Sequence, residues 1–169
     1  AEHKPDNADE RDAADHDDPQ EDAPVAPRRH ESTRRTRATT NRVQLADLER
    51  ILQRRTMSKL MLEQGVTFID PKNAYVSAQA SLGRDTVIHP NVTIEGATEI
   101  GEGCTIRSGT RLTNAKVGDR VEVNDNCLIK DSEIGNDCTV GPMAHLRGKA
   151  VMAERSKVGN FVELKKTKL

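Results

Sequence analysis

Residues 82–112 read LGRDTVIHPNVTIEGATEIGEGCTIRSGTRL, and every sixth residue of this stretch is Leu or Ile. The period extends in both directions, and the count is one residue short at two places, between 112 and 117 and between 129 and 134. Sixteen positions follow the pattern, and all of them are aliphatic or Met: Val76, Leu82, Ile88, Ile94, Ile100, Ile106, Leu112, Val117, Val123, Ile129, Ile134, Val140, Leu146, Met152, Val158 and Leu164. A chain that is 34% hydrophobic would rarely produce this run by chance, so the pattern indicates a hexapeptide repeat.

A six-residue period fits neither an α-helix nor an alternating strand, whose side chains repeat every 3.6 and 2 residues. It is typical of a parallel β-helix, a solenoid in which three hexapeptides form one triangular coil of about 18 residues. The aliphatic residue of each hexapeptide then points inward and stacks on its equivalent about 4.8 Å away in the next coil. Sixteen hexapeptides correspond to about five coils. We therefore predict an all-β fold over residues 66–169, a parallel β-helix with the left-handed sense of known hexapeptide prisms.

Two smaller positions complete the predicted repeat. Gly follows the aliphatic residue directly at six places, where we expect the positive φ that a turn between faces often requires. Four residues after most aliphatic positions stands a small or β-branched residue, which we expect to point inward near a corner. Cys104, Cys127 and Cys138 occupy this position, so we interpret them as buried filler rather than nucleophiles or metal ligands. Three cysteines without a CxxC spacing also argue against a disulfide framework or a zinc site.

A helical pattern precedes the repeat. Apolar residues recur at helical spacing at Leu45, Leu48, Ile51 and Leu52, and they are followed by Leu60, Met61 and Leu62. Thr40 or Asn41 can cap the N-terminus of a helix, and Gly65 can end it. The pattern predicts an amphipathic linker helix within residues 40–65, of a length that usually packs on a neighbour or joins two domains. A short strand is expected at 66–69, before the Asp-Pro pair that follows it.

The beginning of the chain has a different composition. Residues 1–24 contain ten acidic and two basic side chains, whereas residues 25–42 contain six arginines and one Glu. Val25 is the only apolar side chain larger than Ala before Val43. Because such a segment cannot bury apolar surface, we predict that residues 1–39 form a disordered charged tail. Its arginines could touch phosphate, but no reading fold or stacking aromatic accompanies them, so we do not expect nucleic-acid binding.

Several classes of function are disfavoured by what the sequence lacks. No apolar run approaches the roughly 18 residues of a membrane span, and no secretory signal core begins the chain, so a cytoplasmic location is expected. We expect His89 and His145, each next to an inward aliphatic residue, to face outward without a carboxylate partner. We therefore predict no catalytic residue and no metal ligand in this chain.

Several motifs resemble one family of hexapeptide acyltransferases. They are NRVQLADLER at 41–50, GVT at 65–67, DP at 70–71, GRDTVIHP at 83–90, VGPMAHLR at 140–147 and VGNFVELKK at 158–166. These stretches are similar to the interdomain helix and first β-helix coils of the bifunctional N-acetylglucosamine-1-phosphate uridyltransferase/glucosamine-1-phosphate N-acetyltransferase family. The two one-residue slips also fall where that family has them. The resemblance covers about residues 40–169.

The resemblance implies a function and a partial site. The family makes UDP-N-acetylglucosamine for peptidoglycan and lipopolysaccharide in the bacterial cytoplasm, with an Mg²⁺-dependent nucleotidyltransferase domain and a homotrimeric β-helix that uses acetyl-CoA. Arg147 matches the family Arg that contacts the sugar-phosphate or UDP-sugar ligand, and Lys165 matches a Lys that serves the same ligand. A guanidinium fork and an ammonium group suit a phosphate dianion. Because eighteen residues separate them, we expect one side chain above the other on one face.

The family's other metal-binding, catalytic and acetyl-CoA-binding residues have no counterpart in this sequence. Thr40 stands where the family has an Mg²⁺-binding Asn, and the family's catalytic His and acetyl-CoA contacts match positions beyond Leu169. We therefore expect a partial sugar-phosphate site and a chain that is inactive alone, with acetyl-CoA and Mg²⁺ implied only for the full-length family. The alternative is a non-catalytic trimeric β-helix scaffold or interaction module. An ice-binding solenoid is disfavoured because its Thr residues would form regular ladders, and here they are scattered.

Overall fold

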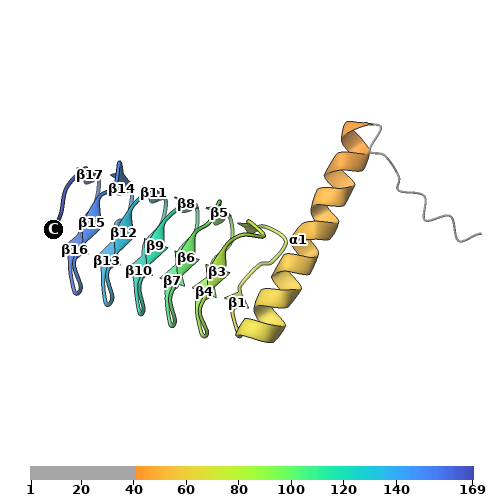
Figure 1. Ribbon diagram of the computed structural model, residues 1–169, viewed down its shortest axis with the longest axis horizontal. Helices are drawn as coiled ribbons and strands as arrows, with labels where there is room; N and C mark the ends of the chain where they lie inside the picture. The colour runs from red at the N-terminus through yellow and green to blue at the C-terminus, as the bar shows by residue number, and fades with distance from the viewer. Residues whose placement is uncertain (1–40) are drawn as a thin grey trace, which may run out of the picture. The chain divides into compact units, whose positions relative to one another are not determined.

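The computed structural model describes residues 41–169, so the tail predicted for residues 1–39 lies outside the described residues. Helix α1 spans Arg42–Gln64, and every later element is a short parallel strand. Successive strands belong to three different sheets in rotation, so each strand pairs with the strand three places along the chain (Figure 1). This arrangement is a parallel β-helix, and the predicted all-β fold class, a left-handed β-helix preceded by one helix, is confirmed.

We name the three sheets face A, face B and face C. Face A contains β1 Thr67–Phe68, β4 Val87–Ile88, β7 Thr105–Ile106, β10 Glu122–Val123, β13 Thr139–Val140 and β16 Lys157–Val158. Face B contains β2 Tyr75–Val76, β5 Thr93–Glu95, β8 Arg111–Thr113, β11 Leu128–Lys130, β14 His145–Arg147 and β17 Glu163–Lys165. Face C contains β3 Ser81–Leu82, β6 Glu99–Ile100, β9 Lys116–Val117, β12 Glu133–Ile134 and β15 Val151–Met152.

The β-helix has one strand more than the sixteen hexapeptides of its period predict, because faces A and B have six strands each and face C has five. The additional strand is β1, in which Phe68 pairs with Ile88 of β4. Phe68 stands eight residues before Val76 rather than six, so it falls outside the hexapeptide register. The sequence pattern therefore predicts the strand at 66–69 but not its place in the first coil.

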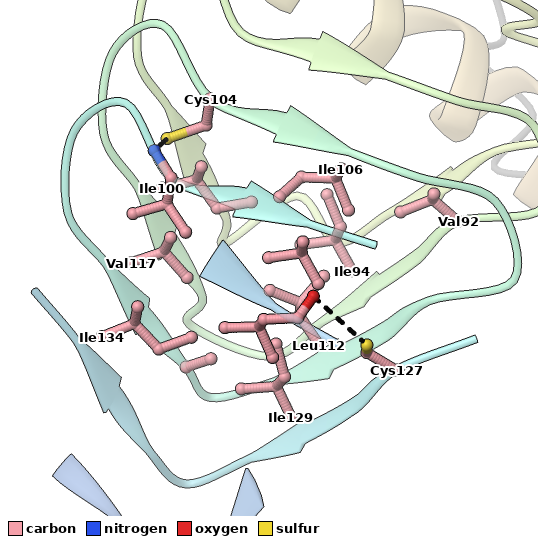
Figure 2. Close-up of a cluster of buried hydrophobic side chains, with 14 of the residues drawn as sticks. Val92, Ile94, Ile100, Cys104, Ile106, Leu112, Val117, Cys127, Ile129 and Ile134 are labelled. Carbon is pink, nitrogen blue, oxygen red and sulfur yellow. Dashed lines mark hydrogen bonds between the residues drawn. The ribbon is translucent and has the colours of Figure 1, made fainter. Parts of the chain in front are cut away.

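The interior consists of stacked aliphatic side chains. All sixteen positions of the six-residue pattern are buried, with exposed fractions between 0% and 9%. On face B, Ile94 lies in register with Leu112, and Leu112 with Ile129, so that aliphatic side chains stack on one another along the axis. Figure 2 shows these side chains meeting those of faces A and C inside the prism. Burial of continuous aliphatic columns supplies the main stabilisation of the fold, because each coil alone would leave its inner face in water.

The corners between faces hold the small inward residues. Thr86 donates from its hydroxyl to the carbonyl of Gly101 at 2.9 Å, and the Cys104 thiol makes the same contact to Gly118 at 3.1 Å. All three cysteines are free and buried, so they lie at the inward position that the repeat predicts. Burial raises the pKa of the Cys104 and Cys127 thiols, so both remain protonated and unreactive near neutral pH.

The expected role of the glycines after the aliphatic residues is wrong at five of the six positions. Of the six glycines that follow an aliphatic residue, only Gly141 has a positive φ. Four of the others stack at the end of face C: Gly83, Gly101, Gly118 and Gly135. A Cβ atom on Gly101 would lie 2.7 Å from the backbone carbonyl of Gly118 in the next coil. These positions therefore require Gly because stacked coils approach closely there, not because the backbone is left-handed.

Positive φ values occur instead at the turns themselves. They belong mostly to Asn, Asp and Gly, as at Asp85, Asn91 and Asn126, which adopt this conformation more readily than other residues. The residues that adopt a positive φ at the turns are therefore different from the glycines that stack at the end of face C.

Helix α1 covers the first coil. The Asn41 side chain accepts a hydrogen bond from the Gln44 amide at 2.9 Å, and Gly65 ends the helix at φ 69°, so both expected caps are present. Met57 and Leu60 are its buried residues. Gln53 donates to the carbonyl of Val76 and accepts from its amide, both at 3.2 Å, so one side chain satisfies the free edge of β2.

The apolar residues predicted to form one helix face are not covered by other residues within 41–169. They are exposed by 45–59%: Leu45, Leu48, Ile51 and Leu52. The residues buried against the β-helix lie further along the helix, in its C-terminal half. Spacing alone identified an apolar stripe, but it did not identify the surface by which the helix packs on the coil.

The glycine column predicts a specific cost for one added methyl group. Gly101→Ala is expected to lower the free energy of unfolding by about 1–3 kcal/mol, because the added Cβ overpacks the contact between coils. The measurement is urea unfolding followed by circular dichroism. Gly159→Ala is the matched control, since Gly159 follows an aliphatic residue in the same way but its Cβ would meet nothing within 4 Å. Equal midpoints for both variants would contradict this account of the column.

The Gln53 contact predicts a local effect at the first coil. Gln53→Leu removes the partner of the Val76 amide, so hydrogen exchange at this amide should accelerate about threefold to tenfold, as expected for one lost hydrogen bond. Two-dimensional NMR after transfer to D₂O provides the measurement. Gln79→Leu, at an exposed residue, serves as the control and should leave exchange at Val76 unchanged. Unchanged exchange in Gln53→Leu would show that Gln53 does not protect this edge.

Candidate functional site

The two residues predicted to bind a sugar phosphate lie next to each other. Arg147 is the last residue of β14 and Lys165 the last residue of β17, and the register pairs them directly. The preceding residue of each strand, Leu146 or Leu164, points into the core, so Arg147 and Lys165 point outward from face B. The predicted stacking of the two cations on one face is therefore confirmed, while their role in binding stays a prediction.

A carboxylate joins this pair. Glu163 lies two residues before Lys165 on the same side of β17, and it forms an ion pair with Arg147 in which the Arg147 Nε donates to the carboxylate. The Arg147 side chain is 39% exposed and that of Glu163 is 50% exposed. Sequence reasoning did not assign a role to Glu163. The period-2 alternation of a strand, which puts residues 163 and 165 on the same side, was the signal that could have found it.

We call His145, Arg147, Glu163 and Lys165 the face B cluster. His145 pairs in register with Glu163, so the four side chains form two stacked rows. The hydrogen bond and positive charge of Arg147 hold the pKa of Glu163 below its usual range, with smaller effects in the same direction from His145 and Lys165. Glu163 is therefore ionised near neutral pH. Arg147 and Lys165 then contribute two positive charges against the one negative charge of Glu163, a balance that favours an anion.

The cluster has free capacity to bind an anion. Within residues 41–169, Glu163 is the only hydrogen-bond partner of the Arg147 side chain, which leaves both terminal nitrogens available. The Lys165 ammonium forms no ion pair or hydrogen bond with the described part of the chain. A planar guanidinium end and an adjacent ammonium group can together contact two oxygens of one phosphate.

A separate groove of about 910 Å³ lies between helix α1 and face B. Tyr75 of β2 stands in its wall, and burial raises the pKa of this phenol, with a further contribution from Glu49 of the helix. The groove contains none of the residues predicted to bind a ligand. It adjoins β2 and β5, at the opposite end of face B from the strands of the face B cluster. We therefore place the candidate site at the face B cluster, which contains the residues predicted to bind a ligand, and not at the groove.

Within 41–169, no three His, Cys, Asp or Glu side chains gather closely enough to hold a metal ion. In the same range, the structure has no helix with the length and apolar character of a bilayer span.

The chain is similar to curated proteins over most of its described part. It is 46% identical over 127 residues to the bifunctional protein GlmU of Pelobacter propionicus, a match that covers 75% of this chain and 27% of that protein. It is 47% identical over 127 residues to GlmU of Heliobacterium modesticaldum, with the same coverage. Its identity to GlmU of Listeria monocytogenes is 37% over 145 residues, which is 86% of this chain and 31% of that protein. The chain thus spans less than a third of these relatives.

A solved structure shares the fold. The acetyltransferase domain of PglB from Neisseria gonorrhoeae aligns with a TM-score of 0.56 and 16% identity, covering 69% of this chain and 58% of that chain. At this identity the likeness concerns the fold alone.

The resemblance inferred from the motifs is confirmed by the GlmU relatives. Residues 64–169, which include the whole β-helix and the face B cluster, match the family described as GMPPB C-terminal domain. Since this match covers well over half of the sequence, the chain belongs to the GMPPB C-terminal domain family.

Proposed function

We propose that this chain forms the linker helix and first β-helix coils of the acetyltransferase half of a UDP-N-acetylglucosamine-synthesising enzyme. In this proposal Arg147 and Lys165 bind the phosphate group of the amino-sugar substrate. The observation that carries it is the direct stacking of the two cations on the outer side of face B, with open donors on both. The similarity to bifunctional GlmU proteins supports the reaction class. The same proposal places the chain in the cytoplasm, with residues 40–65 as linker and 66–169 as β-helix.

The chemistry explains why a phosphate contact matters to an acetyl transfer. The amine of glucosamine-1-phosphate attacks the thioester carbonyl of acetyl-CoA, a C–N bond forms, the C–S bond breaks and the thiol leaves with a proton. The contribution of Arg147 and Lys165 is to hold the phosphate on C1 of the sugar, which fixes the position of the amine on the neighbouring C2. Charge-assisted hydrogen bonds from two fixed cations suit this task because they give both affinity and orientation.

Ligand binding provides the direct test of this proposal. Titration calorimetry with UDP-N-acetylglucosamine should give a measurable Kd for the native chain. Arg147→Ala should raise that Kd about tenfold or more, as expected for a lost charge-assisted hydrogen bond. Arg107→Ala is a matched control, because Arg107 also pairs with a carboxylate across adjacent strands but lies on face A. Identical heats for the native chain and Arg147→Ala would reject the proposed site.

We further propose that the working unit is a homotrimer, as in the bifunctional family that the motifs resemble. Face B presents the cluster on an open surface, so a second chain would have to supply the opposite wall of a closed site. Light scattering is expected to give about 56 kDa, three times the 18.6 kDa of one chain. A mass of one chain at micromolar to millimolar concentration would contradict the trimer.

The second candidate function is a non-catalytic trimeric scaffold or interaction module. The observation that favours it is the exposed apolar stripe of α1, where Leu45, Leu48, Ile51 and Leu52 have no cover from the described residues. The two functions differ in the calorimetry described above. A trimer that gives no heat with UDP-N-acetylglucosamine would favour the scaffold.

A further inference from the structure

The Arg147–Glu163 contact differs from the other Arg–carboxylate pairs between adjacent coils. Arg107 donates from Nε and Nη2 to Glu122, at 3.1 and 2.7 Å. Arg120 donates from the same two nitrogens to the two carboxylate oxygens of Asp137, at 2.7 and 2.9 Å. In both pairs, therefore, the carboxylate occupies the side edge of the guanidinium with two hydrogen bonds. Arg147 uses Nε alone.

This single contact leaves the outer end of the guanidinium open. The two terminal nitrogens of Arg147 have no hydrogen-bond partner within residues 41–169. These two nitrogens form the edge that can bind a phosphate with two parallel hydrogen bonds. An Arg side chain has several rotatable bonds, so an anchor at Nε restricts where that edge points. Glu163 provides such an anchor from the neighbouring strand, beside Lys165.

We propose that Glu163 is a positioning residue that holds the Arg147 guanidinium by its Nε so that its free end and the Lys165 ammonium face one phosphate. This inference rests on the proposed function, because it assumes that the cluster binds a phosphate-bearing sugar. It adds to that function a residue whose charge has the wrong sign for direct contact with the ligand. Glu163 therefore acts through Arg147 and not on the ligand.

The negative charge of Glu163 predicts the opposite effect on binding if Glu163 does not position Arg147. A carboxylate next to a phosphate site repels the ligand, so removing its charge without any other effect should tighten binding. Loss of the anchor at Nε should weaken binding, because Arg147 would then have to be ordered by the ligand itself. The sign of the change in Kd therefore separates a positioning role from simple repulsion.

Two substitutions of Glu163 separate these effects experimentally. Glu163→Gln removes the charge and keeps an oxygen that can accept from Nε, whereas Glu163→Met removes both and keeps a side chain of similar length. The Kd for UDP-N-acetylglucosamine, measured by calorimetry on the full chain, should be about threefold to tenfold higher in Glu163→Met than in Glu163→Gln. Equal Kd values in the two variants, or tighter binding in Glu163→Met, would overturn the proposal.

A double-mutant cycle excludes a merely structural explanation. If Glu163 acts through Arg147, the difference between the Gln and Met variants should vanish in an Arg147→Ala background. A difference that persists there would also overturn the proposal. Glu122→Met, which breaks the corresponding pair on face A, controls for general loss of an interstrand ion pair and should leave the Kd unchanged. If the native chain shows no binding at all, the proposed function fails, which is distinguishable from a failure of the positioning role alone.

Discussion

The structure depends on the parallel hydrogen bonds that join each coil to the next. Amide groups of one coil donate to carbonyls of the following coil throughout the β-helix, for example Thr93 to Thr110 at 3.0 Å and Arg111 to Cys127 at 2.9 Å. Because parallel strands at this spacing keep their side chains in register, every residue must tolerate its equivalent directly above and below. Inside the prism this requirement selects aliphatic columns. At the end of face C it selects a column of glycines, since any Cβ there would meet the next backbone.

The same register also orders the outer surface. Charged side chains of adjacent coils come within reach of one another, as in the pair between Arg107 and Glu122 along face A and the pair between Arg120 and Asp137 at two stacked turns. The face B cluster is one more product of this rule, because two outward positions of β14 stand over two of β17. What distinguishes it is that two cations stack on one another and only Arg147 of the two is paired with a carboxylate within the described residues. All four residues of the cluster therefore lie on strands rather than on loops, which suits the binding role proposed for them.

The sequence predicts the interior of this fold well, because the residues that recur with the six-residue period are the residues that are buried. Every sixth aliphatic residue and all three cysteines are where the repeat places them. The stacking of Arg147 over Lys165 follows from the same arithmetic. Contacts that depend on distances between coils cannot be read from the period. For this reason the sequence predicts a positive φ at glycines that are required by close packing, and it assigns no role to Glu163. The place of Phe68 was missed because its strand lies outside the six-residue count.

The central claim is that equivalent residues 17 or 18 positions apart stack in parallel, and NMR can test it through scalar couplings across backbone hydrogen bonds. The structure predicts a coupling from the Leu128 amide to the Ala144 carbonyl and another from the His145 amide to the Val162 carbonyl. Amides of residues 76–164 that couple instead to carbonyls four residues earlier, or to antiparallel neighbours, would contradict the parallel β-helix and with it the assignment of the face B cluster.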